Sequence, residues 1–484
     1  MIRSVPVRGL LVLRRARFPA ANTARFVSAL SSTEFEDVDI AIVGSGVAGA
    51  ALACALANDP ALGAHSIALI DANEIASRYT PDEGEFSNRV VSLAPRAVEF
   101  LDKLGAWERI PASRRNGYTD MRVWDACGGG QVSFSASTIG APALAHMVEL
   151  SAIRSALLDA LPSRVRTFAP ATLTTPIRRD SEQSDNFPVL DLTGSSSSSP
   201  IAMRARLVLG ADGAASPVRQ HLMPSHTAFF GRDYGASGLV ATVAVEALDG
   251  NATAWQRFLP TGTLAMLPLD CDTSSLVWSL PRDLALKLRG LPAADFTALV
   301  NAAFFYPPDE VEVLLRNPTG ATDLAAEIEW RDTVHETESD LGSAVLPPHV
   351  LDVADASRAA FPLRVRHASS YVGDRVAILG DAAHLIHPLA GQGLNLGLSD
   401  AESLARTISA AAQSGLDVGH PHALDAYPAE RYAANAAMLT ACDGLHHLFA
   451  TENAAVAWTR SFGLNRFNAW DAAKRRAMAF AMGK

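Results

Sequence analysis

Two apolar runs, separated by a glycine turn and a helical stretch, stand near the start of the chain. Val38–Val43 is a mostly apolar run of strand-forming residues, and an Ala- and Leu-rich stretch that ends at Asn58 has the composition of a helix. Ser66–Ile70 is a second buried-strand pattern, and Asp71 follows it directly. Strand, glycine turn, helix, strand and acid in this order predict a βαβ unit.

Later apolar patterns predict a second sheet and a helical end. Closely spaced strand patterns between about 236 and 282 predict an antiparallel sheet. Residues 283–358 give a mixed pattern that favours no single element, and the pattern from about 393 onward is mainly helical. The other predicted elements are strands at Met121–Asp125, Gln131–Phe134, 205–213 and Arg375–Leu379, a helix at 150–161 and, within the second sheet, strands at Leu239–Val245, Trp255–Leu259, Thr263–Leu267 and Ser275–Leu280.

The composition is that of a folded, acidic protein. The 484 residues are 49% hydrophobic and 19% charged, with a formal net charge of −10. These values exclude a disordered chain and argue against nucleic-acid binding. The four cysteines, Cys54, Cys127, Cys271 and Cys442, stand far apart without metal-ligand spacing. We therefore expect a reducing compartment and neither a disulfide framework nor a zinc site.

Residues 1–33 differ from the rest of the chain in charge. They hold six arginines and no acid, so their loss would take the formal charge from −10 to −16. This Arg-rich, Ser-containing amphipathic composition is typical of a mitochondrial presequence, with a disordered basic tail as the alternative. The uncharged run at 40–57 is long enough to span a membrane. Its spaced glycines and flanking acids, Asp39 and Asp59, favour the βαβ unit instead, so no integral span is expected.

The glycine turn has the spacing GxGxxG. Gly44 would allow the tight turn, Gly46 would let the backbone approach a pyrophosphate, and Gly49 would let the helix pack closely on the strand. The free N–H groups at the helix start attract phosphate. Asp71 is placed to bind ribose hydroxyls. The sequence therefore predicts a dinucleotide site, against the alternative of a chance glycine-rich turn.

Two further segments place a carboxylate just after a strand, where ligands bind in α/β sheets. Within the second of them, the turn Gly391-Gln392-Gly393 opens a helix whose positive end can stabilise negative charge. The segments are LGADGAASPVR at 209–219, with Asp212 and Gly213, and ILGDAAHLIHPLAGQGLN at 378–395, with Gly380 and Asp381.

Together the three segments resemble the fingerprints of the group A flavoprotein aromatic hydroxylases, which have the p-hydroxybenzoate-hydroxylase-like fold. The third segment is similar to that of the ubiquinone-biosynthesis hydroxylases of bacteria and mitochondria, as are NRVVSL (88–93), GAWERI (105–110), MRVWDACG (121–128) and AWQRFLPTG (254–262). MRVWDA and AWQRFLP, with the basic leader, favour the mitochondrial branch of coenzyme Q synthesis. The resemblance covers about 38–484 and has two departures: Arg96, where a small residue is expected, and the serine-rich stretch at 194–200.

The resemblance implies an α/β fold with FAD as the cofactor. Asp381 would accept a ribityl hydroxyl, and the helix start near Gly391 would stabilise negative charge on the reduced flavin. Arg89 is expected beside the flavin, with a surface arginine as the alternative, and Pro388, Leu394 and Asn395 are expected along its face. The implied parts are a discontinuous Rossmann-like FAD-binding domain (38–120, 150–232 and 361–420), an antiparallel-sheet substrate domain (121–149 and 233–360) and a helical C-terminal region (421–484).

His384 and His387 have a spacing that two metal ligands could use. Packing and turn roles beside the flavin loop are the favoured alternative, because the sequence offers no evident third ligand.

The function implied by the resemblance is hydroxylation, at ring position 5, of a 4-hydroxybenzoate-derived ring that carries a polyprenyl tail. O₂ would be the oxidant and a flavin hydroperoxide the reagent, so the cofactor carries the chemistry and no catalytic side chain is named. The tail needs an apolar tunnel. Its candidate walls, for which ordinary sheet core is the alternative, are Leu239, Val240, Trp255, Phe258, Leu267 and Trp278.

The implied partners are ferredoxin with its reductase as the electron source, other ubiquinone-biosynthesis proteins in a complex, and the matrix face of the mitochondrial inner membrane. The helix expected at about 464–483 mixes cations with apolar residues such as Trp470, and it could lie on a membrane or simply pack. Two other functions stay open. One is a hydroxylase of another phenol that oxidises NAD(P)H directly, and the other is a non-catalytic, flavin-stabilised scaffold.

Overall fold

A computed structural model describes the chain from residue 35 to residue 483, with gaps. The described ranges are 35–75, 79, 85–180, 186–194, 200–223, 227–246, 250–316, 324–338, 346–388, 391–451 and 453–483. The predicted presequence at 1–33 and most of the serine-rich stretch at 194–200 lie outside these residues.

The first sheet is built around the βαβ unit. Strand β1 (Glu36–Val43) pairs in parallel with β2 (Ile67–Ile70) on one side and with β11 (Ile201–Gly210) on the other. All four residues of β2 are buried, as expected for a strand covered on both faces. The other strands are β8 (Val165–Phe168), β9 (Thr172–Arg179), β10 (Pro188–Thr193), β18 (Val372–Gly373) and β19 (Val376–Ile378). The order is β18-β19-β11-β1-β2-β8, with β9 and β10 joined through β11.

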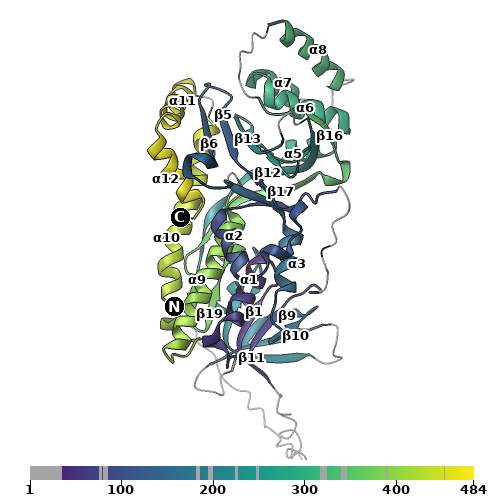
Figure 1. Ribbon diagram of the computed structural model, residues 1–484. Coiled ribbons are helices and arrows are strands. Elements are labelled where there is room, and N and C mark those ends of the chain that lie inside the picture. The colour runs from purple at the N-terminus through teal and green to yellow at the C-terminus, as the bar shows by residue number, and fades with distance from the viewer. Residues whose placement is uncertain are drawn as a thin grey trace, which may run out of the picture.

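Helices cover this sheet and share its core. Fully buried alanines, such as Ala50 and Ala53, line the helix that follows β1 and allow close helix–helix approach. The helices are α1 (Val47–Asn58), α2 (Pro95–Lys103), α3 (Leu150–Asp159), α4 (Pro217–Leu222), α9 (Gly393–Gln413) and α10 (Ala426–Phe449). Figure 1 shows this group in the lower half of the molecule, with α1 beside α9.

The second sheet is mainly antiparallel, as predicted. Its order is β20-β17-β12-β15-β14-β13-β5-β6, with β16 paired to β12. Among the described strands of this second sheet, the β13–β5 pair is the only parallel one. The strands are β5 (Asp120–Asp125), β6 (Gln131–Ser135), β12 (Phe229–Val245), β13 (Thr253–Leu259), β14 (Gly262–Pro268), β15 (Thr273–Pro281), β16 (Val350–Val353), β17 (Ala359–Ala368) and β20 (His384–Leu385).

One face of the second sheet is covered by helices from the region that the sequence left undecided. They are α5 (Arg282–Arg289), α6 (Ala293–Phe305), α7 (Pro308–Arg316) and α8 (Leu324–Glu338), seen at the top of Figure 1. The other face meets a small third sheet through a cluster that contains Tyr118, Ala254 and Leu267. The strands of that sheet are β3 (Val90–Leu93), β4 (Asn116–Tyr118) and β7 (Ala145–Glu149).

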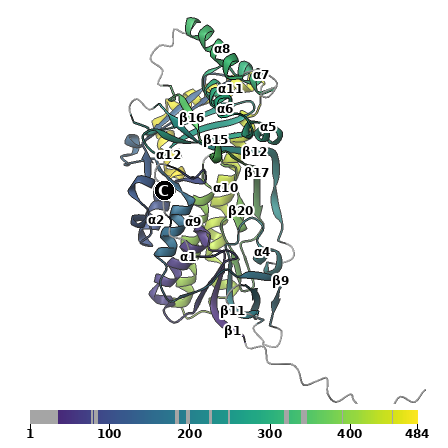
Figure 2. The same cartoon turned by 90° about the vertical axis from the view of Figure 1, so that its right-hand side faces the viewer.

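Strand β12 is much longer than the predicted Leu239–Val245. Its first ten residues, FFGRDYGASG, include two segments that pair with β17, 229–233 and 237–238. The exposed residues Gly231, Arg232, Asp233 and Gly235 interrupt any apolar pattern there. Figure 2 shows β12 and β17 side by side as long strands. The domain boundaries proposed from the sequence stay a prediction.

The chain ends in two helices, where one was expected at about 464–483. Helix α11 (Ala454–Asn468) ends where the Asn468 side chain accepts the N–H of Ser133 at 3.1 Å. Trp470 has a non-helical backbone, and α12 (Asp471–Ala481) starts afresh with an acid in its first turn. The C-terminal helices run along one side of the molecule (Figure 1). No helix in the described ranges is long and apolar enough to cross a membrane.

Candidate cofactor site

The three motifs predicted from the sequence meet at the carboxyl ends of β1, β11 and β19. Gly44 has a left-handed backbone (φ +103°), and a Cβ there would overlap the carbonyl oxygen of Ala211 in the second motif. A Cβ on Gly380, in the third motif, would lie 3.6 Å from the Cβ of Ala48 in the first. Segments that are far apart in sequence therefore enclose one location, where ligands bind in open α/β sheets.

The glycines of the first motif differ in their surroundings. A Cβ on Gly49 would overlap the carbonyl oxygen of Gly44, so α1 packs on the turn as closely as glycine allows. A Cβ on Gly46 would meet nothing within 4 Å. Gly46 is also the N-cap of α1 and supplies no capping side chain, which leaves the N–H groups of the helix start facing open space. This geometry suits a pyrophosphate.

Asp71 lies at the end of β2, directly beside the glycine turn. Its Oδ2 accepts the N–H of Ser45 at 2.6 Å and the Ser45 hydroxyl at 2.7 Å, and its Oδ1 accepts the N–H of Asn73 at 2.8 Å. Burial acts to raise the pKa of Asp71, but the hydrogen bonds from Asn73 and Ser45 outweigh it, so the pKa is lowered. Asp71 is an anionic acceptor at neutral pH.

Arg154 supports this corner from α3 and was not singled out in the sequence. Its Nε and Nη2 donate to the carbonyl and hydroxyl oxygens of Ser45, at 2.9 and 2.8 Å. An arginine in an otherwise apolar helix was the available signal.

Asp212 in the second motif has one oxygen left to bind. Oδ2 accepts the N–H of Val218 at 3.0 Å, whereas Oδ1 is buried and has no hydrogen-bond partner in the structure. Burial raises the pKa of this carboxyl. A Cβ on the adjacent Gly213 would meet nothing within 4 Å. A buried acceptor without a donor, next to open space, is the signature expected where a ligand supplies the hydrogen bond.

The third motif turns through a short 3₁₀ helix, Gly380–Ala382. Gly380 has a left-handed backbone (φ +57°), and its N–H donates to Asp400 Oδ2 at 3.2 Å. The Asp381 side chain is exposed to solvent at its tip, although protein surrounds it on most sides, and this desolvation raises the pKa of its carboxyl.

Asp400 in α9 lies directly beneath this turn and is fully buried. Besides Gly380, its carboxylate contacts His384 Nε2 at 2.6 Å, Arg431 Nε at 2.9 Å and Asn435 Nδ2 at 3.0 Å. Burial acts to raise the pKa of Asp400, but His384 and Arg431 outweigh it and hold the pKa at about 2. Sequence reasoning missed Asp400, although an acid inside the apolar stretch LNLGLSDAESLA was a usable signal.

The two histidines of the third motif have separate surroundings. His384 bonds to Asp400, whereas His387 packs its ring against Tyr234 and His446, with centroid distances of 5.1 and 4.8 Å. Burial lowers the pKa of His387 to about 4.

The turn at Gly391 lies against the end of β3. A Cβ on Gly391 would lie 3.4 Å from the Cβ of Ser92. Asn395 joins the same two segments, because its Oδ1 accepts the N–H of Ala94 and its Nδ2 donates to the Ser92 carbonyl oxygen, both at 2.9 Å. The N-cap of α9, Gln392, makes no side-chain capping bond, so this helix start is also open. Leu394 packs on the first core, Pro388 and Gly393 lie in the same loop and helix start, and the flavin contacts expected of them stay predictions.

The last turn of α12 reaches this loop. Gln392 Nε2 donates to the Ala481 carbonyl oxygen at 3.5 Å, and Arg96 Nη1 donates to that of Gly483 at 3.1 Å. Arg96, the departure noted in the sequence, also pairs with Glu402 of α9 at 3.2 Å. A small residue here would leave the end of the chain without this anchor.

Arg89 is exposed and directly precedes β3, and its carbonyl oxygen accepts the N–H of Leu150 at 2.9 Å. Its position beside the flavin stays a prediction.

The predicted wall residues divide between the two faces of the second sheet. Leu239, Trp255 and Trp278 are buried in the cluster formed with the covering helices. Phe258 lies on the other face and stacks on Phe449 at a centroid distance of 3.7 Å, and Leu267 belongs to the cluster with Tyr118. Side chains alternate between faces along a strand, and the sequence alone did not say which face meets the cofactor half.

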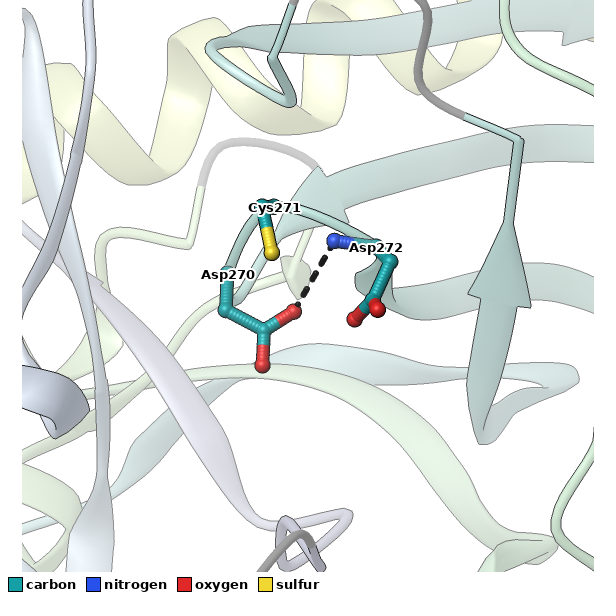
Figure 3. A group of neighbouring side chains, drawn as sticks. All are labelled: Asp270, Cys271 and Asp272. Atoms are coloured by element: carbon teal, nitrogen blue, oxygen red, sulfur yellow. Dashed lines mark hydrogen bonds between the residues drawn. The ribbon is translucent and has the colours of Figure 1, made fainter.

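A separate group of possible metal ligands, Asp270, Cys271 and Asp272, lies in the β14–β15 turn (Figure 3). Asp270 Oδ1 accepts the backbone N–H groups of Asp272 at 3.2 Å and Thr273 at 2.7 Å. These bonds shape the turn itself, so the cluster has a local structural role and we assign it no further one.

Comparison with known proteins agrees with this geometry. An FAD binding domain family matches residues 37–289 and 310–442. The chain is 34% identical over 471 residues to the human protein named ubiquinone biosynthesis monooxygenase COQ6, mitochondrial, covering 96% of each chain. It is 34% identical over 455 residues to the Saccharomyces cerevisiae protein of the same name, covering 89% of this chain and 90% of that protein.

Solved structures show the same fold at lower identity. PqsL from Pseudomonas aeruginosa, described as a probable FAD-dependent monooxygenase, matches with a TM-score of 0.61 and 21% identity, covering 88% of this chain and 100% of that chain. The p-nitrophenol 4-monooxygenase PnpA from Pseudomonas putida matches with a TM-score of 0.63 and 17% identity, covering 92% and 97%. At these identities the likeness concerns the fold alone.

FAD fits the residues present. The open helix start at Gly46 suits its pyrophosphate, and the unpartnered Oδ1 of Asp212 can accept from a bound hydroxyl or N–H group. The start of α9, which has no side-chain cap, offers further N–H groups that could stabilise negative charge on a flavin ring. The chain is therefore an FAD-dependent monooxygenase that belongs to the COQ6 family of ubiquinone biosynthesis monooxygenases.

Proposed function

We propose that this protein hydroxylates position 5 of the aromatic ring of a polyprenyl 4-hydroxybenzoate-derived intermediate in ubiquinone biosynthesis. The observation that carries the proposal is similarity over nearly the whole chain to relatives from yeast to human that are named for this pathway. The convergence of three motifs on one open location supports it from the geometry.

Bound FAD supplies the redox chemistry with O₂, and the protein binds, orients and excludes water. The start of α1 at Gly46 would hold the pyrophosphate, and Asp71 would hold the ribose. Asp212 and Asp381 would accept hydroxyl groups of the chain that joins the two halves of the cofactor. Asn395 holds the start of α9 to the end of β3, and the N–H groups of that helix start would stabilise negative charge on the flavin ring.

We place the substrate ring on the face of the second sheet that looks toward the third sheet. Gly391 lies against Ser92, and the Ser92 hydroxyl lies 3.0 Å from the hydroxyl of Tyr118. Tyr118 in turn shares a cluster with Leu267. These contacts connect the flavin loop to an apolar region, which an apolar aromatic substrate requires.

The proposal includes finer assignments of location, electron donor and partners. The protein acts in the mitochondrial matrix as a peripheral protein of the inner membrane, takes electrons from ferredoxin and its reductase, and works within a complex of ubiquinone-biosynthesis proteins. The relatives named as mitochondrial and the basic composition of residues 1–33 support the location.

Deletion of the gene in its host tests the assignment. We expect loss of ubiquinone and accumulation of a polyprenylated precursor that lacks the position-5 hydroxyl, identified by mass spectrometry. An unchanged quinone profile would contradict the substrate. A purified protein that oxidises NAD(P)H rapidly with a small phenol would favour the other hydroxylase class. Bound FAD that never turns over with any substrate would favour the scaffold.

A further inference from the structure

The C-terminal helices carry a concentration of exposed apolar side chains. Of fifteen large hydrophobic residues that are exposed in the described ranges, seven lie between 445 and 480. Trp458 and Trp470 are the most exposed of them, at 69% and 66%. Two of the seven, Leu445 and Leu448, lie near the end of α10. The other five lie on α11, on α12 or in the turn between them: Val456, Trp458, Phe462, Trp470 and Phe480. An apolar surface of this kind marks a binding surface in a soluble protein.

Helix α11 presents these residues outward because its opposite face is firmly bound. Arg460 forms a buried ion pair with Asp125 of β5, with Nε to Oδ2 at 2.7 Å and Nη2 to Oδ1 at 2.9 Å. Ser461 donates to the same carboxylate at 3.1 Å. Asn465 and Asn468 accept backbone N–H groups of β6. These contacts fix which side of α11 faces the sheet. The apolar side chains on its opposite side are therefore exposed because of the fold, and not because the helix is partly unfolded.

The outer side is an ordered stripe. Trp458 and Phe462, four residues apart, stack at a centroid distance of 5.7 Å and an interplanar angle of 12°. The guanidinium of Arg466, four residues further on, lies 5.1 Å from the centre of the Phe462 ring. On α12, Arg476 and Phe480 have the same four-residue spacing and both are exposed. Trp470 lies in the turn between the two helices. Each helix thus carries an aromatic ring and a cation four residues apart on its exposed side.

The charge of this region is opposite to that of the whole protein. Residues 453–483 contain one acid, Asp471, which pairs with Lys474 at 3.5 Å. Arg466, Arg475 and Arg476 are exposed, and no acid of the described residues forms an ion pair with them. The full chain carries −10. This cationic surface would repel the same surface of a second copy in a two-fold symmetric dimer, and its charge is complementary to an anionic lipid surface.

We propose that the outer surface of α11 and α12 binds a bilayer that contains anionic lipids. Trp458, Phe462 and Trp470 enter the headgroup region, where amphipathic aromatic rings are preferred, and the three arginines contact lipid phosphates. The inference rests on the proposed function in one respect: a polyprenylated substrate dissolves in membranes, so a docked enzyme meets it there. Binding to lipid itself does not depend on that substrate.

The test uses the full-length holoprotein and vesicles of equal amounts of phosphatidylcholine and phosphatidylglycerol with brominated acyl chains. Bromine quenches only tryptophans that enter the bilayer, so the readout is independent of binding through residues 1–33. We expect quenching of the native protein and loss of most of it in the double variant Trp458→Ser/Trp470→Ser. Trp330→Ser is the matched control, because Trp330 is 61% exposed on α8. The double variant Arg475→Glu/Arg476→Glu should lower the affinity for the anionic vesicles, measured by the same quenching, on the order of tenfold.

Three results would overturn the proposal. Quenching could persist in the Trp458/Trp470 variant, it could fall equally in the Trp330 control, or it could be as strong on pure phosphatidylcholine as on the anionic vesicles. A native dimer that the Trp458/Trp470 variant converts to a monomer would assign the surface to a second copy instead. FAD content and hydroxylation of a short-tailed substrate should be unchanged in all variants, so failure of the lipid contact and failure of the proposed function are distinguishable.

Discussion

The Gly380 N–H donates to the buried carboxylate of Asp400 at 3.2 Å. One side chain of α9 therefore fixes the backbone of the third motif, and Arg431 and His384 hold that side chain in turn. The arrangement gives this turn a buried support made of several charged and polar groups.

Replacement of Asp400 should damage both stability and cofactor binding. Asp400→Asn keeps the shape but leaves the buried Arg431 without its anion, so we expect a loss of about 3–5 kcal/mol in the free energy of unfolding. The apparent Kd for FAD should rise as the Gly380 turn loosens. Urea unfolding and FAD titration measure the two effects. Asp233→Asn is the control, because its ion pairs with Arg282 and Arg364 lie on the exposed surface, where solvent screens them. Equal effects of the two variants would contradict the role of Asp400.

Substitution of two glycines of the first motif should have different effects, one on folding and the other on FAD binding. In Gly49→Ala the new methyl group overlaps the Gly44 carbonyl oxygen, so the turn cannot form and the protein should not accumulate in folded form. In Gly46→Ala the methyl group meets no protein atom within 4 Å, and it would enter the space in which we place the FAD pyrophosphate. That variant should melt like the native apoprotein yet retain little FAD. Circular dichroism and the flavin absorbance per protein report the difference, and a Gly46→Ala variant with full FAD content would refute the placement.

Stability should fall as the pH drops below about 6.5, before most carboxylates titrate. Burial holds the pKa of His367 and of His387 at about 4 in the folded protein, against an ordinary value of 6.5. A histidine with a lowered folded pKa contributes stability that is complete above 6.5 and is lost as the pH falls toward 4. Each of the two histidines should lower the free energy of unfolding by about 1.4 kcal/mol for each pH unit in that window.

Urea unfolding at several pH values between 7.5 and 5 measures this dependence. His387→Gln should flatten the curve, whereas His422→Gln should not, because the His422 side chain is 83% exposed. A native curve without slope in this range would show that neither histidine is neutral in the fold.

Arg460 should decide whether α11 stays on the second sheet. Arg460→Met leaves the buried Asp125 carboxylate without its cation, at an expected cost of about 3–5 kcal/mol. Hydrogen exchange should then accelerate in 454–468 more than in β1 or β11. Arg466→Met, on the outer side of the same helix, should leave exchange unchanged. Uniform acceleration throughout the protein would argue against a local role.

Substitutions on the two faces of the second sheet should have different effects on the KM for the ring substrate. Leu267→Trp, on the face toward the third sheet, should raise KM for the ring substrate on the order of tenfold while FAD stays bound. Leu239→Met, in the cluster with the covering helices, should leave KM unchanged because it conserves volume in a core. The reverse pattern would move the substrate to the helix-covered face.

Local signals in the sequence were sufficient for the βαβ unit. Gly44, Gly49 and Asp71 belong to one short strand–helix–strand unit, so their spacing alone predicts where they meet. The start of β12 was missed because exposed glycines and charged residues interrupt its apolar pattern, and the pairing with β17 that makes it a strand comes from a distant segment. The same reason explains Asp400: its importance depends on Arg431 and Gly380, which only the folded chain brings to it. Which face of the sheet Leu239 and Leu267 occupy depends on strand register, which composition does not encode.

The anchoring of the final helices has a genetic consequence. Arg460 ties α11 to β5, and the carbonyl oxygens of Ala481 and Gly483 are held by Gln392 and Arg96 at the other half of the molecule. A nonsense or frameshift mutation late in the gene therefore does not trim a dispensable tail. An allele that stops before codon 460 removes both attachments at once, and it should behave as a null allele even though every nucleotide-binding motif is still translated.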